Sequence, residues 1–324
     1  MNKEHFLELG LLVGTSFAGI AGVNVIENKF AVRNHRLESE ENNYYQWKNF
    51  KIYYTKKGFG KPIILLHDLK PDASSYEWSE IIDKLAETHR VYAFDLLGCG
   101  RSDKPEITYT NFYYVQILLS FIKTQICEKT FVISSGYSSV TALMAGAYDP
   151  SKFSGIAFIN PPSIGSMARI PNWHTIFAMR MMQIPVFGDL IYNVHYGRAA
   201  IDNRFSEELL YNPFRVSTEL IETYLEAAHL GNGKGRFLEA SLAGRYLNIN
   251  ITHALKSLKV PAWILVGEEL RNETAIAKSW ADIARSLGIR TVSQSKNYPH
   301  YEKPKETVSY LQAILSENEN NKRK

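Results

Sequence analysis

The chain has little cysteine: Cys99 and Cys127 are its two cysteines among 324 residues, and neither stands in a CxxC pair or at a zinc-ligand spacing. Neither a disulfide framework nor a metal site is indicated, and we expect no metal and no cofactor. An excess of charge of one sign is also missing, because 37 basic and 33 acidic residues leave a formal net charge of +4. No basic stripe is interleaved with aromatic residues, so we expect no binding to nucleic acid.

Long hydrophobic runs are scarce as well, and the N-terminus holds the exception. Leu9 to Ile26 is a run of eighteen residues without a charge, close to the roughly 20 residues with which a helix crosses a bilayer. The residues before it carry no excess of basic charge, which disfavours a cleaved secretory signal. More basic residues follow the run than precede it, which favours a cytoplasmic main domain. We predict a membrane anchor over residues 6–27; a cleaved signal and a soluble or interfacial helix remain alternatives.

Most of the remaining sequence alternates between strand and helix patterns, as in "PIILLH", "RVYAFDLLG" and "GIAFINPP". Such alternation predicts an α/β fold with a mostly parallel sheet and helices on both faces. A linker over 28–48 leads into a core formed by 49–162 and 256–316, and 317–324 is a tail. Residues 163–255 interrupt the strand series with a helical stretch rich in Met and aromatic residues. We expect this insertion to be a cap over the carboxyl edge of the sheet, where such folds bind ligands.

Three segments resemble the α/β-hydrolase family, in particular its capped esterase, lipase and dehalogenase-like branch. "KPIILLHDL" is similar to the family's strand ending in His-Gly, "VYAFDLLGCGRSDKP" matches its Asp-x-x-Gly-x-Gly-x-Ser turn, and "YPHYEKP" is similar to the segment around its catalytic histidine. The resemblance implies a nucleophile on a GxSxG elbow, an acid after a later strand, and a histidine base near the C-terminus.

The elbow segment "SSGYSS" departs from the family pattern. Counting back from Pro150 by the usual helix length places Gly136 at the nucleophile position. A second register places Ser138 there instead, but it puts Val140 where a small residue is needed. We favour the first register, in which the nucleophile has no side-chain oxygen.

The acid and base positions depart in the same way. The resemblance aligns Leu270 with the acid and Asn297 with the base, and it places His300 at a second, later histidine of the family pattern. A leucine cannot orient an imidazolium, and an asparagine amide cannot accept a proton near neutral pH. In the oxyanion region the candidate residues are Asp68, Leu69 and Tyr137, and Asp68 replaces the usual glycine. A carboxylate there opposes developing negative charge.

Two functions follow from this pattern. The first is a membrane-anchored α/β-hydrolase-fold protein with a degenerate triad, non-catalytic or weakly active, that binds an apolar small molecule, an acyl ester or a partner under its cap. Its candidate cap pocket is Trp173, Phe177 and Met181. The second is a divergent serine hydrolase, esterase- or lipase-like. It would use Ser138 or Ser135 as the nucleophile, His300 as the base and Glu269 as the orienting acid.

Overall fold

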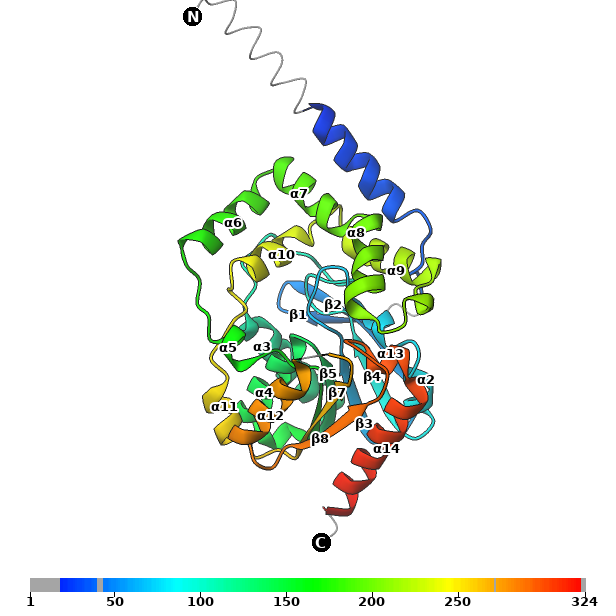
Figure 1. Ribbon diagram of the computed structural model, residues 1–324, viewed down its shortest axis with the longest axis vertical. Helices are drawn as coiled ribbons and strands as arrows, with labels where there is room; N and C mark the ends of the chain where they lie inside the picture. Colours follow the sequence, from blue (N-terminus) through cyan, green and yellow to red (C-terminus); the bar gives the residue numbers. More distant parts are fainter. Residues whose placement is uncertain (1–17, 40–42, 271, 322–324) are drawn as a thin grey trace, which may run out of the picture.

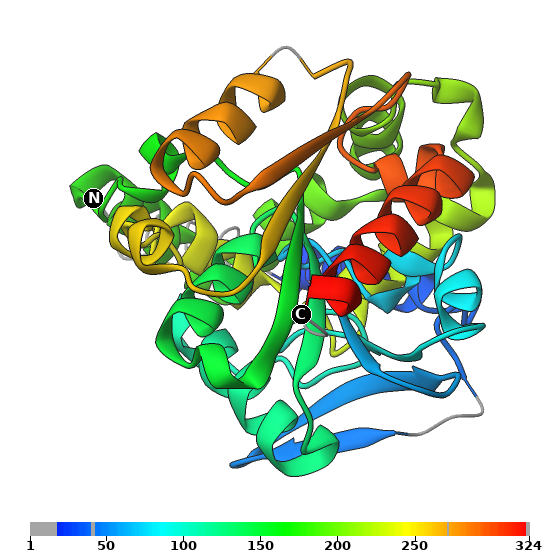
Figure 2. The same cartoon turned by 90° about the horizontal axis from the view of Figure 1, so that it is seen from below.

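The computed structural model describes residues 18–39, 43–270 and 272–321, and in them helices cover both faces of one eight-stranded sheet (Figure 1). The strand order is β1-β2-β4-β3-β5-β6-β7-β8. The pairs β1–β2 and β2–β4 are antiparallel, and the other neighbours are parallel. The prediction of a mostly parallel sheet with helices on both faces is confirmed. Figure 2 shows this sheet from below, with β1 and β2 in blue at one edge and β8 in orange at the other.

The strands within the described residues are β1 (Tyr44–Trp47), β2 (Phe50–Lys57), β3 (Pro62–Leu66), β4 (Arg90–Phe94), β5 (Thr130–Ser135), β6 (Phe153–Ile159), β7 (Ala262–Gly267) and β8 (Gly288–Val292). The helices are residues 18–31, α2 (Ile82–Ala86), α3 (Asn111–Phe121), α4 (Ser138–Tyr148), α5 (Ile164–Met167), α6 (Trp173–Gln183), α7 (Phe187–Tyr196), α8 (Arg198–Asn203), α9 (Thr218–His229), α10 (Arg236–Ala243), α11 (Thr252–Ser257), α12 (Glu273–Ile283), α13 (Pro299–Glu302) and α14 (Pro304–Asn321). Shorter helical turns are η1 (Ser75–Trp78), η2 (Ile122–Ile126), η3 (Pro150–Lys152), η4 (Arg204–Leu209) and η5 (Pro213–Arg215).

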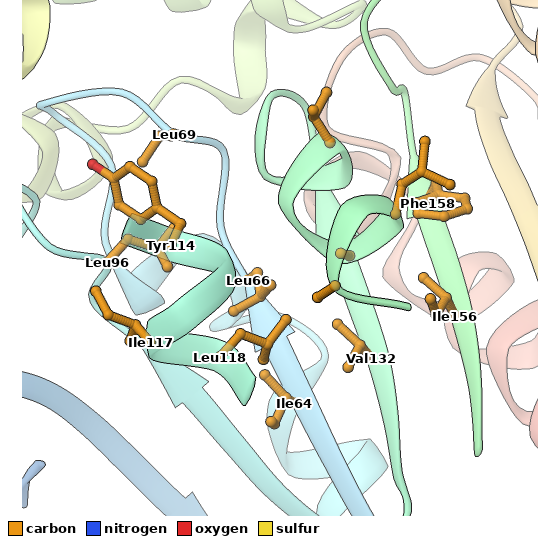
Figure 3. Packing of buried hydrophobic residues seen from close by; sticks show 14 of the residues in the cluster. Ile64, Leu66, Leu69, Leu96, Tyr114, Ile117, Leu118, Val132, Ile156 and Phe158 are labelled. Atoms are coloured by element: carbon orange, nitrogen blue, oxygen red, sulfur yellow. The ribbon is translucent and has the colours of Figure 1, made fainter. Parts of the chain in front are cut away.

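The central strands are buried along their whole length because helices cover both faces of the sheet. In β3, Ile64 and Leu66 belong to the core cluster that includes Leu118 of α3, whereas Ile63 and Leu65 belong to the cluster on the other face. Figure 3 shows α3 over the first of these faces. Burial of one such aliphatic side chain stabilises the fold by roughly 1.5–3 kcal/mol. The two clusters therefore fix the positions of the central strands, and the candidate site lies at the ends of these strands.

The insertion between β6 and β7 forms the helices α5 to α11, and α6 to α10 lie together at one end of the sheet (Figure 1). This end is the carboxyl edge of the parallel strands, because cap residues contact the loop that follows β3. A Cβ added to Gly235 would lie 3.2 Å from Pro71 Cβ, and the Arg204 guanidinium lies 2.6 Å from Asp72 Oδ2. The cap therefore closes directly over the position expected for a hydrolase site.

Two features of the N-terminal region bear on the sequence interpretation. The predicted anchor, residues 6–27, lies largely outside the described residues, and its described part belongs to the helix 18–31. Within the described residues no helix is both long and apolar enough to span a bilayer. Strand β1 lies inside the segment assigned to a linker, because its alternate residues Tyr45 and Trp47 are buried in the core.

Candidate active site

A sharp turn joins β5 to α4, and Gly136 stands at its apex. Its φ of +53° lies in the left-handed region, which favours glycine. The Gly136 N–H donates to the carbonyl of Ile159 at 3.0 Å, which fixes the turn against β6. The chain therefore forms a strand–turn–helix elbow with Gly136 at its apex, the residue that the first of the two sequence registers aligns with the nucleophile.

The carboxylate of Asp68 occupies the space that a nucleophile side chain would need. A Cβ added to Gly136 would lie 2.1 Å from Asp68 Oδ1. The same oxygen accepts a hydrogen bond of 2.8 Å from the backbone N–H of Tyr137, the residue that follows the apex. In the oxyanion hole of an elbow, this N–H is the donor that stabilises the tetrahedral intermediate. Here a carboxylate of the chain itself fills that position.

Lys70 neutralises this carboxylate. Its ammonium lies 2.8 Å from Asp68 Oδ2, and the side chains of Asp68 and Lys70 are 8% and 30% exposed. Burial lowers the pKa of Lys70, but the neighbouring Asp68 carboxylate outweighs that effect, so the pKa is raised above its ordinary value. Leu69, between them, is buried. The loop after β3 thus contributes a complete ion pair to the oxyanion region.

Further charged groups lie where the cap meets this loop. Arg204 of η4 pairs with Asp72, and Tyr196 of α7 donates a hydrogen bond to Glu239 of α10. Burial raises the pKa of Glu239, although the hydrogen bond from Tyr196 opposes the shift. Arg204 and Asp72 therefore form an ion pair between cap and core, whereas Tyr196 and Glu239 pair within the cap.

The residues aligned with base and acid do not form a relay. The Asn297 amide donates to the Glu208 carbonyl of the cap at 3.3 Å, and the Asn297 carbonyl accepts from Asn160 Nδ2 at 2.9 Å. Leu270 is half-buried in the loop after β7, and Glu269 next to it is exposed. Asn297 and Leu270 can neither accept a proton nor orient an imidazole, and the carboxylate of Glu269 is exposed to solvent.

The alternative nucleophiles are used in the structure of the elbow. Ser138 is fully buried at the start of α4, and its hydroxyl oxygen lies 2.9 Å from the Leu66 carbonyl and 2.8 Å from the Ser135 carbonyl, either of which can accept its one proton. Ser135 is also buried, and its N–H donates to Ser138 Oγ at 3.2 Å. Both hydroxyl-bearing residues thus lie inside the fold and stabilise the turn.

His300 lies in a buried pair of its own. Its Nε2 is 3.3 Å from Glu77 Oε1, and its ring stacks on Trp78 with the centroids 4.5 Å apart. The second Glu77 oxygen accepts from the Asp68 N–H at 2.9 Å. The imidazole of His300 is therefore in contact with a carboxylate and an indole, and Glu77 lies between it and the backbone of Asp68.

The cap residues proposed for a pocket lie elsewhere. Trp173 and Phe177 are 73% and 62% exposed, and Met181 is half-buried. Five cavities of about 150 to 600 Å³ lie in the described part of the chain, and none of these five is lined by Trp173, Phe177, Gly136 or Asp68. The structure thus places two of the three cap candidates on the outer surface of the cap.

Sequence reasoning missed Lys70 and Asp72, although one signal pointed to them. Asp68, Lys70 and Asp72 alternate along the segment that directly follows β3, and the carboxyl end of a parallel strand is where ligands bind. Three alternating charges at such a place indicate one charged group beside the site. Sequence offered no comparable signal for Glu77, which lies in the helical turn η1.

This chain belongs to the α/β-hydrolase fold family, because the family model described as alpha/beta hydrolase fold matches residues 61–252. The resemblance inferred from the motifs is confirmed. Over 92 residues the chain is 35% identical to a 2-hydroxy-6-oxo-6-(2'-aminophenyl)hexa-2,4-dienoic acid hydrolase of Metapseudomonas resinovorans, which covers 28% of this chain and 32% of that protein. Over 106 residues it is 30% identical to a haloalkane dehalogenase of Mesorhizobium japonicum, with coverages of 33% and 34%. The matched segments thus span about a third of these relatives' own lengths.

Similarity to solved structures extends over more of the chain. The crystal structure of a membrane phospholipase A, described as a novel bacterial virulence factor, superposes with a TM-score of 0.68 at 19% identity. The match covers 98% of this chain and 100% of that one. At this level of identity the comparison establishes the shared fold.

Proposed function

We propose that this chain is a non-catalytic or very weakly active α/β-hydrolase-fold protein, held at a membrane by its N-terminal segment, that acts by binding an apolar ligand or partner. One observation carries the loss of activity: Asp68 fills the space of the nucleophile side chain and takes the N–H of Tyr137. An ester carbonyl that approaches the elbow would find the Asp68 carboxylate there. It would find neither a nucleophilic hydroxyl nor a free N–H donor. Removal of the nucleophile alone costs a working triad enzyme on the order of 10⁶ in turnover.

The uncharged run from Leu9 to Ile26 supports the membrane location. The structural neighbour that covers 98% of this chain is described as a membrane phospholipase A, which is consistent with that location. Trp173 and Phe177 are exposed, so they offer an apolar partner a binding surface on the outside of the cap.

A fluorophosphonate probe tests the catalytic part of the proposal, since it labels activated serines. We expect no labelling of the full-length protein and ester hydrolysis at background. A variant that combines Asp68→Gly, Gly136→Ser, Leu270→Asp and Asn297→His should gain labelling, because it frees the N–H and supplies nucleophile, acid and base. Gly136→Ser alone should gain none.

The divergent serine hydrolase gives the opposite result in the same assay. Strong labelling of the unmodified protein that disappears in Ser138→Ala or Ser135→Ala would overturn the proposal. We expect neither substitution to change the probe signal, because Ser138 and Ser135 are buried and the Ser138 hydroxyl is within hydrogen-bond distance of two backbone carbonyls.

A further inference from the structure

The N-terminal helix 18–31 forms hydrogen bonds to the cap through Asn24. Asn24 is buried; its amide donates to the Val186 carbonyl at 2.9 Å, and its side-chain oxygen accepts from Asn193 of α7 at 2.9 Å. Ile26 and Phe30 are more than half exposed. A surface helix in water turns its apolar stripe toward the core and its polar residues outward. This helix buries the polar Asn24 and leaves Ile26 and Phe30 exposed beside the charged Glu27 and Lys29.

Helix α6 of the cap also leaves apolar side chains exposed. Met179 faces the protein and is buried, whereas Trp173, Ile176 and Phe177 are exposed. These three residues and Arg180 are spaced i, i+3, i+4 and i+7, so they share one face of the helix. The exposed face thus carries an indole, a phenyl ring and an aliphatic side chain, followed by a cation.

The two helices that expose apolar residues lie at the same end of the molecule. Asn24 contacts Val186 in the turn between α6 and α7, and it contacts Asn193 in α7 itself. Figure 1 shows α6, α7 and the N-terminal helix together at the end opposite the C-terminus. We define the cap face by its exposed residues: Arg169, Ile170, Trp173, Ile176, Phe177 and Arg180.

Charge on the cap face selects an anionic, apolar partner. Residues 163–188 contain two arginines, Arg169 and Arg180, and neither aspartate nor glutamate. Helices that lie in a bilayer interface combine exposed aromatic and aliphatic residues with basic ones, and tryptophan is enriched at that depth. Anionic lipids attract such basic residues by about 1 kcal/mol each near the surface. The apolar run from Leu9 leads into the helix that packs on this same end.

We propose that the cap face lies in the surface of an anionic lipid bilayer, with Trp173 and Phe177 among the upper acyl chains and the two arginines at the headgroups. The inference rests on the proposed membrane location and adds an orientation: the cap faces the lipid, and the amino ends of the parallel strands face away from it. The N-terminal segment then brings the chain to the membrane, and the cap face fixes the orientation of the domain relative to the bilayer.

Trp173 provides a direct readout, because the other four tryptophans are buried: Trp47, Trp78, Trp263 and Trp280. Full-length protein and Trp173→Phe are reconstituted into vesicles of phosphatidylcholine and phosphatidylglycerol, with and without bromine on the acyl chains. The difference between their emission spectra reports Trp173. We expect bromolipid to remove more than about half of it, because the apolar face of an interfacial helix lies roughly 5–10 Å into the headgroup and acyl boundary. Arg169→Glu with Arg180→Glu should weaken the quenching.

A tryptophan far from the cap serves as the control. Phe59 is exposed in the turn before β3, at the opposite edge of the sheet. Phe59→Trp in the Trp173→Phe background should be quenched by aqueous acrylamide and unaffected by bromolipid. If the protein floats with the vesicles but Trp173 is quenched by acrylamide and unaffected by bromolipid, the orientation is wrong and the membrane location still holds. Trp173 emission insensitive to both quenchers indicates a protein partner or a second copy on the cap face, and it also overturns the inference. A chain that does not float with the vesicles refutes both.

Discussion

The substitution Gly136→Ser tests the geometry on which the proposed loss of activity depends. The left-handed φ of +53° costs a residue with a Cβ about 1 kcal/mol or more. That Cβ would stand 2.1 Å from Asp68 Oδ1, so the carboxylate has to move. It then gives up its hydrogen bond from Tyr137, and a hydrogen bond to a charged group contributes about 2 kcal/mol. We expect Gly136→Ser to lower the free energy of unfolding by about 3 kcal/mol in total.

The two terms separate in a double-mutant cycle with Asp68→Gly. Without the carboxylate the serine meets the backbone strain alone, so Gly136→Ser should cost about 1 kcal/mol in that background. Urea unfolding followed by circular dichroism measures all four proteins. Gly231→Ser is the matched control, because Gly231 has a φ of +76° and its nearest contact for a Cβ is an ordinary 3.4 Å. It should cost the same in both backgrounds.

The reasoning is refuted if Gly136→Ser costs as much in the Asp68→Gly background as in the unmodified protein. It also fails if Gly136→Ser is no more destabilising than Gly231→Ser. Either result would mean that Asp68 does not hold the space above the elbow in solution.

Three other predictions concern location, acid stability and binding. Full-length protein should sediment with membranes, and a version that begins at Asn28 should not; detergent-free recovery of the full chain in the supernatant would count against an anchor. Burial alone would raise the pKa of Asp95, but its ion pair and hydrogen bonds with Arg101 lower it from 3.8 to about 2. A folded-state pKa below the unfolded value stabilises the fold above pH 3.8, and this contribution is lost as the pH falls toward 2. Asp95→Asn should therefore destabilise the protein by roughly 3 kcal/mol at neutral pH and flatten the acid limb of its stability profile; an unchanged acid limb would contradict the assignment. Fatty acids and acyl esters that bind the native state should raise the melting temperature, and no shift across a broad panel would leave the bilayer as the apolar partner.

The sequence contained enough information for the sheet and for the elbow. Continuous apolar runs such as "PIILL" and "FVIS" predict strands buried on both faces, and the structure has β3 and β5 there. The position of Pro150 after the following helix predicted the glycine at the apex. These features depend on local pattern, in which residues a few positions apart decide the conformation.

Contacts between distant segments could not be predicted in the same way. Asp68 and Tyr137 are 69 positions apart, and nothing local to either residue indicates that a carboxylate reaches the elbow. The cap was ambiguous for another reason. Helix α6 has apolar residues on both sides, with Trp173 and Phe177 on one and Met179 on the other, so periodicity does not tell which side is buried.

The groups at the elbow depend on one another, which explains why several family positions differ together. The Asp68 carboxylate fits only because Gly136 has no Cβ. Once Gly136 removes the nucleophile, the N–H of Tyr137 has no oxyanion to bind, and Asp68 supplies an acceptor that satisfies it. Lys70 balances the added charge. Without a nucleophile, Leu270 and Asn297 have no proton to relay, and Asn297 can bind the cap through Glu208 instead. Reversal of a single position breaks this set of contacts without rebuilding the triad, so activity should return only when the positions change together.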